Sequence, residues 1–97
     1  MIPKEINILG IPHTVKACED GFSLGDKSLG EIDYSKAEIR INKDMPDVLQ
    51  MQTLVHEWVH GALVLLGFNE ESNNEQFVQA LSVAICQTFQ LKGGKDG

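Results

Sequence analysis

Residues 54–68 read LVHEWVHGALVLLGF, an apolar run interrupted by His56, Glu57 and His60. A buried polar group without a partner costs roughly 1 to 3 kcal/mol, so three ionisable groups inside a core segment need something to bind. The run is also shorter than the roughly 18 to 20 clean apolar residues that a membrane span requires. We therefore expect a buried segment with a polar site on one side, and no membrane partner.

The residues around this run predict one long helix over residues 46–66. Asp44 suits the N-cap, Pro46 and Asp47 suit the first turn, and Gly67 suits the C-terminal stop. On such a helix a polar strip and an apolar side face in opposite directions. The strip consists of Gln50, Thr53, Glu57 and His60, and the apolar side of Val55, Trp58, Val59, Ala62 and Leu66. We expect a cleft along the strip.

The flanking segments predict an α+β fold. Before residue 44, apolar residues alternate with polar ones at the period of half-buried strands, and a Gly-rich stretch at residues 20–30 predicts a loop. A second helix is expected over residues 73–91, with a packing stripe of Phe77, Leu81, Ala84, Ile85 and Thr88. The expected fold is a small antiparallel N-terminal sheet of three to four strands, followed by the long helix and a second packing helix.

Length and composition predict a single cytoplasmic domain over residues 1–97, with residues 92–97 frayed. The N-terminus turns polar too soon for a secretory signal, and Cys18 and Cys86 lack the spacing of a metal or redox pair. Two reduced thiols are expected. The net charge is −6 and the basic residues are scattered, which argues against a nucleic-acid partner.

The three polar residues of the run form the pattern H-E-x-x-H. On a helix, His56 and His60 lie one turn apart, with Cβ atoms about 5 to 6 Å from each other, so both rings can bind one tetrahedral metal. Glu57 is rotated by about 100° and flanks the metal position instead of occupying it. The pattern therefore predicts two zinc ligands and a general base that acts on water.

A catalytic zinc has three protein ligands and one open position, so a third ligand must come from elsewhere. The candidates are His13, Glu70, Glu71 and Glu75. We favour Glu75, because an antiparallel second helix brings its first turn beside the last turns of the first helix. The alternative is structural, since Ser72-x-x-Glu75 also has the form of a capping box.

Two segments together resemble a known group of enzymes. His56-Glu57-x-x-His60 followed by Asn74-Glu75-x-x-Val78-Gln79-x-Leu81-Ser82 resembles the gluzincins, metallopeptidases whose third zinc ligand is a glutamate that opens a downstream helix. In size and layout the chain is similar to the minigluzincins and to short phage and prophage relatives of the ImmA/IrrE metallopeptidases.

The resemblance implies Glu75 as the third ligand and Gln79 as a hydrogen-bond partner of a ligand, at a position where an acidic residue or Asn is expected. It also implies that the strand at residues 37–42 borders the cleft and pairs with an extended peptide. The alternative for residues 37–42 is an ordinary strand inside the sheet.

The expected function is that of a zinc-dependent peptidase of peptide or protein substrates, in which Glu57 activates the attacking water. Tyr34 and His13 are candidate donors to the oxyanion. A phage-encoded origin, with action in the host cytoplasm, fits the same resemblance. The alternative is a zinc-bound regulatory or interaction module whose activity is weak or self-inhibited. Glu57 favours the enzyme, because a purely structural zinc site has no use for it.

Overall fold

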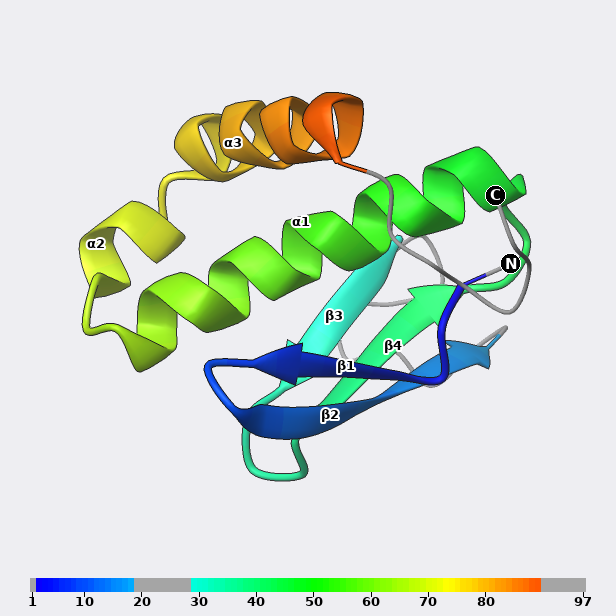
Figure 1. Cartoon of the computed structure of the whole chain (residues 1–97), viewed down its shortest axis with the longest axis horizontal. Helices are drawn as coiled ribbons and strands as arrows, with labels where there is room; N and C mark the ends of the chain where they lie inside the picture. The colour runs from blue at the N-terminus through cyan, green and yellow to red at the C-terminus, as the bar shows by residue number, and fades with distance from the viewer. Residues whose placement is uncertain (1, 19–28, 90–97) are drawn as a thin grey trace.

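The computed structural model describes residues 2–18 and 29–89. Four strands, β1 (Glu5–Ile8), β2 (Ile11–Cys18), β3 (Gly30–Asp33) and β4 (Glu38–Asn42), form one sheet. They are followed by helices α1 (Asp47–Leu65), α2 (Asn69–Ser72) and α3 (Glu75–Thr88). Helix α1 crosses one face of the sheet, and α3 packs on the other side of α1 (Figure 1). The predicted α+β fold, a sheet followed by helices, is confirmed.

The sheet is mixed, whereas the sequence analysis predicted an antiparallel one. Its strand order is β1-β2-β4-β3, in which β2 and β4 are parallel and the two outer pairs are antiparallel. Alternation of apolar residues is the same in both kinds of pairing, so the pattern did not distinguish them. Because β4 pairs on both sides, the expectation that residues 37–42 offer an open edge is wrong. The alternative, a strand inside the sheet, is correct.

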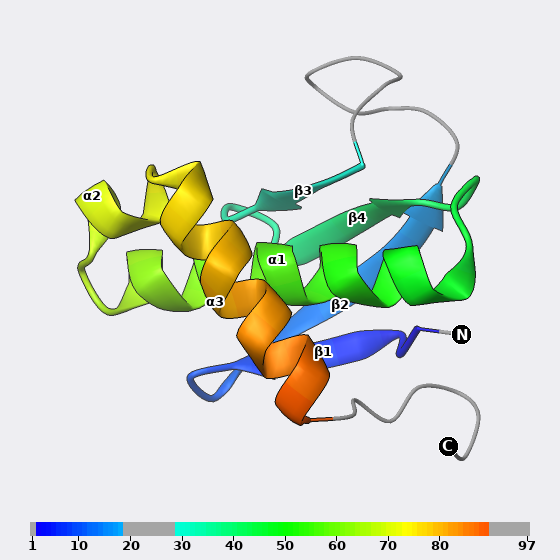
Figure 2. The ribbon, with the colours of Figure 1, turned by 90° about the horizontal axis from the view of Figure 1, so that it is seen from above.

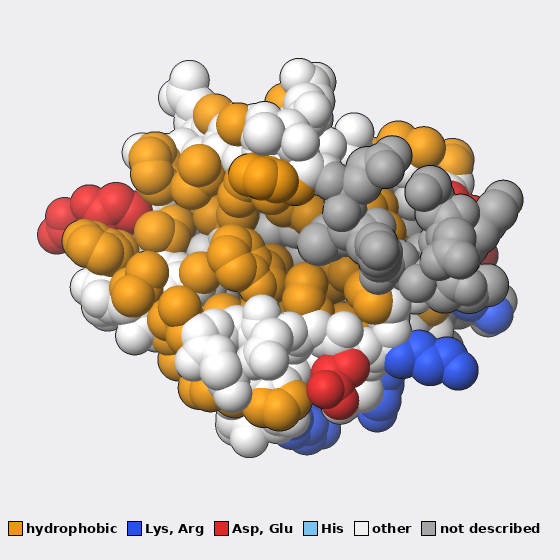
Figure 3. Space-filling view, viewed as in Figure 1, with side chains coloured by type: hydrophobic (Ala, Val, Ile, Leu, Met, Phe, Trp, Pro, Cys, Tyr) orange, Lys and Arg blue, Asp and Glu red, His pale blue; other side chains and the backbone are white. Residues whose placement is uncertain are grey.

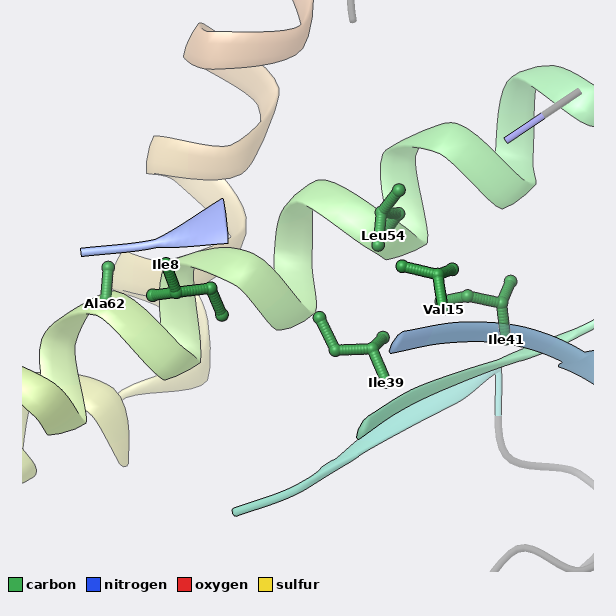
Figure 4. Close-up of a cluster of buried hydrophobic side chains, with 6 residues drawn as sticks. All are labelled: Ile8, Val15, Ile39, Ile41, Leu54 and Ala62. Carbon is green, nitrogen blue, oxygen red and sulfur yellow. The ribbon is translucent and has the colours of Figure 1, made fainter. Parts of the chain in front are cut away.

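The main core lies between the sheet and α1. Strand alternation directs Ile8, Val15, Ile39 and Ile41 toward α1, where they meet Leu54 and Ala62 (Figure 4). Gly61 lies at the same contact, where an added Cβ would be 2.8 Å from Cδ1 of Ile8 and 3.0 Å from Cδ1 of Ile32. The missing side chain therefore lets α1 approach the sheet closely, one residue after His60.

The ends of α1 largely follow the prediction. The helix begins at Asp47 with Pro46 as its N-cap, and Asp44 does not cap it, because Asp44 lies in the turn that follows β4. At the other end, the Phe68 N–H donates to the Leu63 carbonyl at 2.8 Å and the Gly67 N–H donates to the Val64 carbonyl at 3.0 Å. These two bonds and the positive φ of Gly67 define a Schellman motif, which confirms the predicted stop.

The segment after α1 differs from the prediction. Residues 69–72 form the one-turn helix α2 where a loop was expected, and α3 begins at Glu75 instead of residue 73. Asn74 caps α3, with its Oδ1 accepting from the Phe77 N–H at 3.1 Å, so Ser72 does not form the capping box. The predicted end of this helix at residue 91, the frayed tail and most of the Gly-rich loop lie outside the described residues.

The packing stripe of α3 also differs from the prediction. Val78 and Ser82 are buried, and Val78 packs with Val55 and Val59 of α1, whereas Phe77 and Leu81 are about 40% exposed, at 43% and 38%. Ile85 belongs to the packed face, as predicted. In this orientation of the helix, Glu75 and Gln79 face the histidines of α1.

None of the helices in the described part of the chain is long and apolar enough to cross a membrane. Cys18 and Cys86, both within that part, form no disulfide.

Candidate metal centre

Helix α3 crosses over α1 (Figure 2). His56 and His60 of α1 and Glu75 of α3 form one group of possible metal ligands. One ligand atom from each side chain lies within 4.8 Å of the others. The Nε2 atom of His60 is 2.7 Å from Oε1 of Glu75, and Nε2 of His56 is 3.4 Å from Oε2 of Glu75. The other candidate ligands, His13, Glu70 and Glu71, do not belong to this group in the described part of the chain.

The second nitrogen of each histidine ring has its own partner. Nδ1 of His56 lies 2.8 Å from Oε1 of Gln79, and Nδ1 of His60 lies 3.1 Å from Oγ of Ser72. An amide oxygen can only accept, so Nδ1 of His56 donates to Gln79 and its Nε2 lone pair is left for a metal. The Gln79 contact is the one implied by the resemblance. The Ser72 contact was not predicted, because the pattern Ser72-x-x-Glu75 suggested only a capping box.

This donor set fits a catalytic zinc. Two imidazole nitrogens and one carboxylate oxygen are the usual three protein ligands of such a site, and they leave the fourth tetrahedral position open. The donor atoms of the three side chains lie within 4.8 Å of one another, so one cation can bind to all three. The geometry accepts a divalent metal and does not by itself identify it.

Glu57 lies beside these ligands and is 8% exposed. The pKa of its carboxyl group is raised from 4.5 to about 7, chiefly by burial; His56 opposes this rise, and the nearby charges of Glu75 and Glu31 add to it. A carboxyl group with a pKa near neutrality can both accept and release a proton, which is the requirement for a general base that later acts as an acid.

Two of the three candidate ligands, His56 and Glu75, line a cleft of about 250 Å³ between the start of β3, α1 and α3. Gly30 forms one wall, where the backbone lies so close to α1 that an added Cβ would be 2.7 Å from Cγ2 of Thr53. Leu29 and Leu49 add exposed apolar surface near the metal ligands. The lining consists of Leu29, Gly30, Leu49, Gln52, Thr53, His56, Glu57, Glu75 and Gln79. Thr53 and Glu57 belong to the polar strip for which the sequence predicted a cleft.

The two candidate oxyanion donors differ in their surroundings, and neither lines the cleft as described. His13 is buried, with Nδ1 placed 2.9 Å from the Ile11 carbonyl oxygen. Tyr34 follows the last residue of β3 and is half exposed. Partial burial raises the pKa of its phenol, and the charge of Glu57 adds to that rise. Tyr34 is therefore within the electrostatic range of Glu57.

Comparisons with protein-family models, with curated proteins and with solved structures found no match to this chain.

Proposed function

We propose that the chain is a zinc-dependent peptidase of the gluzincin type, which hydrolyses peptide bonds with Glu57 as its general base. The observation that carries this proposal is the convergence of His56, His60 and Glu75 beside a nearly buried Glu57, which lines one cleft together with His56 and Glu75. A structural zinc site normally has four protein ligands. Three ligands and an adjacent carboxyl group favour catalysis.

In this proposal His56, His60 and Glu75 bind the zinc, and Glu57 transfers the proton. A zinc ion bound by the three ligands supplies the Lewis acidity that activates water and polarises a peptide carbonyl. Glu57, which lines the cleft beside His56 and Glu75, accepts the proton of the attacking water and delivers it to the leaving amine. Tyr34 is the preferred candidate donor to the oxyanion, because the charge of Glu57 contributes to the raised pKa of its phenol.

The outer edge of β3 is the proposed binding edge for the substrate backbone, in place of residues 37–42. Among the described strands β3 has β4 as its one partner, and its first residue lines the cleft. An extended peptide can add to such an edge by main-chain hydrogen bonds. With Leu29 and Leu49 beside the ligands, the side chain next to the scissile bond is expected to be apolar.

The proposal is tested by comparing the zinc-loaded wild-type protein with the variant Glu57→Gln. Both are mixed with a set of unstructured peptides, cleavage is measured by mass spectrometry, and zinc is measured by atomic emission. Both proteins should hold one zinc per chain, and the variant should cleave at least about 100-fold more slowly, because general base catalysis contributes 10² to 10⁴ in rate.

His56→Ala is the control, since it should lose both zinc and cleavage. Equal cleavage by wild type and Glu57→Gln would contradict the role of Glu57. Zinc binding by both proteins with cleavage by neither would favour the alternative, a regulatory or interaction module.

A further inference from the structure

Ser72 is the last residue of α2 and is 5% exposed. Its Oγ lies 3.1 Å from Nδ1 of His60 and 3.4 Å from the carbonyl oxygen of the same residue. These contacts link a short helix that contributes no metal ligand to a ring of the metal centre.

The two contacts use different capacities of one hydroxyl group. A serine hydroxyl has one donor and two acceptor lone pairs, so it can donate to the His60 carbonyl while it accepts from the His60 Nδ1–H. With a metal bound, the ring then presents the lone pair of Nε2 to that metal, on the side where Glu75 lies. Ser72 is thus placed to fix the tautomer and the rotation of the ring.

The other ring is held in a similar way from a different helix. Gln79 of α3 accepts from Nδ1 of His56 at 2.8 Å. The two rings on α1 are therefore held by neutral groups from two separate elements, Gln79 of α3 and Ser72 of α2.

We propose that Ser72 is a positioning residue of the metal centre, which orients His60 as a ligand and makes α2 a part of the site. The proposal rests on the zinc site of the proposed function and not on peptidase activity. Partners of this kind typically contribute 10- to 100-fold to metal affinity. The loss of the Ser72 hydroxyl is therefore expected to weaken zinc binding by roughly that factor.

The test compares Ser72→Ala with Ser82→Ala. Ser82 is a matched control, because it is also a buried serine, 3% exposed, and its hydroxyl donates to the Val78 carbonyl at 2.7 Å. Zinc affinity is measured by competition with a chromophoric chelator, and the visible spectrum is recorded with cobalt(II) as a substitute. Ser72→Ala should bind zinc roughly 10- to 100-fold more weakly and shift the cobalt bands. Ser82→Ala should match the wild type in both measurements.

Denaturant unfolding of the metal-free proteins separates a positioning role from a general loss of structure. If Ser72→Ala does not fold, the His60 Nδ1–H of the zinc-loaded wild type is followed by NMR instead, and slow exchange with water is expected. Equal zinc affinity of Ser72→Ala and Ser82→Ala, or rapid exchange of that proton, would overturn the proposal. Failure of the wild type to hold zinc would instead overturn the metal site on which the proposal rests.

Discussion

Glu57 carries a clear electrostatic cost. Its carboxyl group is nearly buried, and burial together with Glu75 and Glu31 raises its pKa to about 7. The folded protein therefore retains a proton on Glu57 at pH values where the unfolded chain has released it. Above that range, the folded protein must hold a poorly solvated charge.

The stability of the metal-free protein should consequently depend on pH through Glu57. The contribution is fully present below pH 4.5 and is lost as the pH rises through about 7, which amounts to about 3 kcal/mol for a shift of this size. Glu57→Gln lacks this loss, so the variant should be more stable than wild type above neutral pH. Denaturant unfolding with a chelator present, at several pH values, measures the difference. A difference between the two proteins that does not change with pH would contradict this explanation.

The residues of the candidate site differ in how well the sequence predicts them. His56, Glu57 and His60 share one helix, so their spacing fixes their geometry. Glu75 depends on how α3 packs, and the antiparallel arrangement of two helices was sufficient to favour it. Ser72 was missed, because its local pattern suggested a cap and Asn74 has that role instead. Contacts that form only through tertiary packing cannot be predicted from a local sequence pattern.

Among the secondary-structure elements, α3 has two apolar faces. The face that is buried is not the one that the sequence analysis predicted. Glu75 is the only charged residue of this helix, so no charged face indicates how the helix is oriented. The face with Val78 is buried against α1, and the face with Phe77 is exposed. Burial of Val78 brings Glu75 and Gln79 to the histidines.

Two alanine substitutions test this orientation. Val78→Ala removes two methyl groups from a fully buried position and should lower the free energy of unfolding by roughly 1 to 3 kcal/mol. Phe77→Ala changes an exposed side chain and should cost less than about 1 kcal/mol, despite the larger deletion. Chemical denaturation of both variants gives the comparison. A larger loss for Phe77→Ala would mean that the predicted stripe, and not the observed one, faces α1.

The long helix was the easiest element to predict, because apolar periodicity, a proline at its N-terminus and Gly67 all agree. The strands were also predicted, but their order was not. Parallel pairing of β2 with β4 depends on how the chain returns to the sheet, and that is not encoded in the alternation of single strands. Because the observed strand order places β4 inside the sheet, the proposed peptide-binding edge is that of β3.

At the scale of the whole molecule, the sheet, α1 and α3 form three layers. The cleft lies between the edge of the sheet and the two crossing helices. On the face shown in Figure 3, hydrophobic side chains gather over α1 and α3, and acidic ones lie at the end formed by α2. The cleft is also lined by acidic groups, Glu57 and Glu75, and no Lys or Arg is among its described lining residues. This charge distribution favours a bound cation over an anion at the site.

X-ray absorption at the zinc edge of the zinc-loaded protein tests the central claim most directly, because it reports which atoms surround the metal. We expect one zinc per chain with two imidazole nitrogens at about 2.0 to 2.1 Å and oxygen ligands at about 2.0 to 2.2 Å, in agreement with His56, His60 and Glu75. Sulfur at about 2.3 Å, which would indicate Cys18 or Cys86, or a protein that retains no zinc, would contradict the claim.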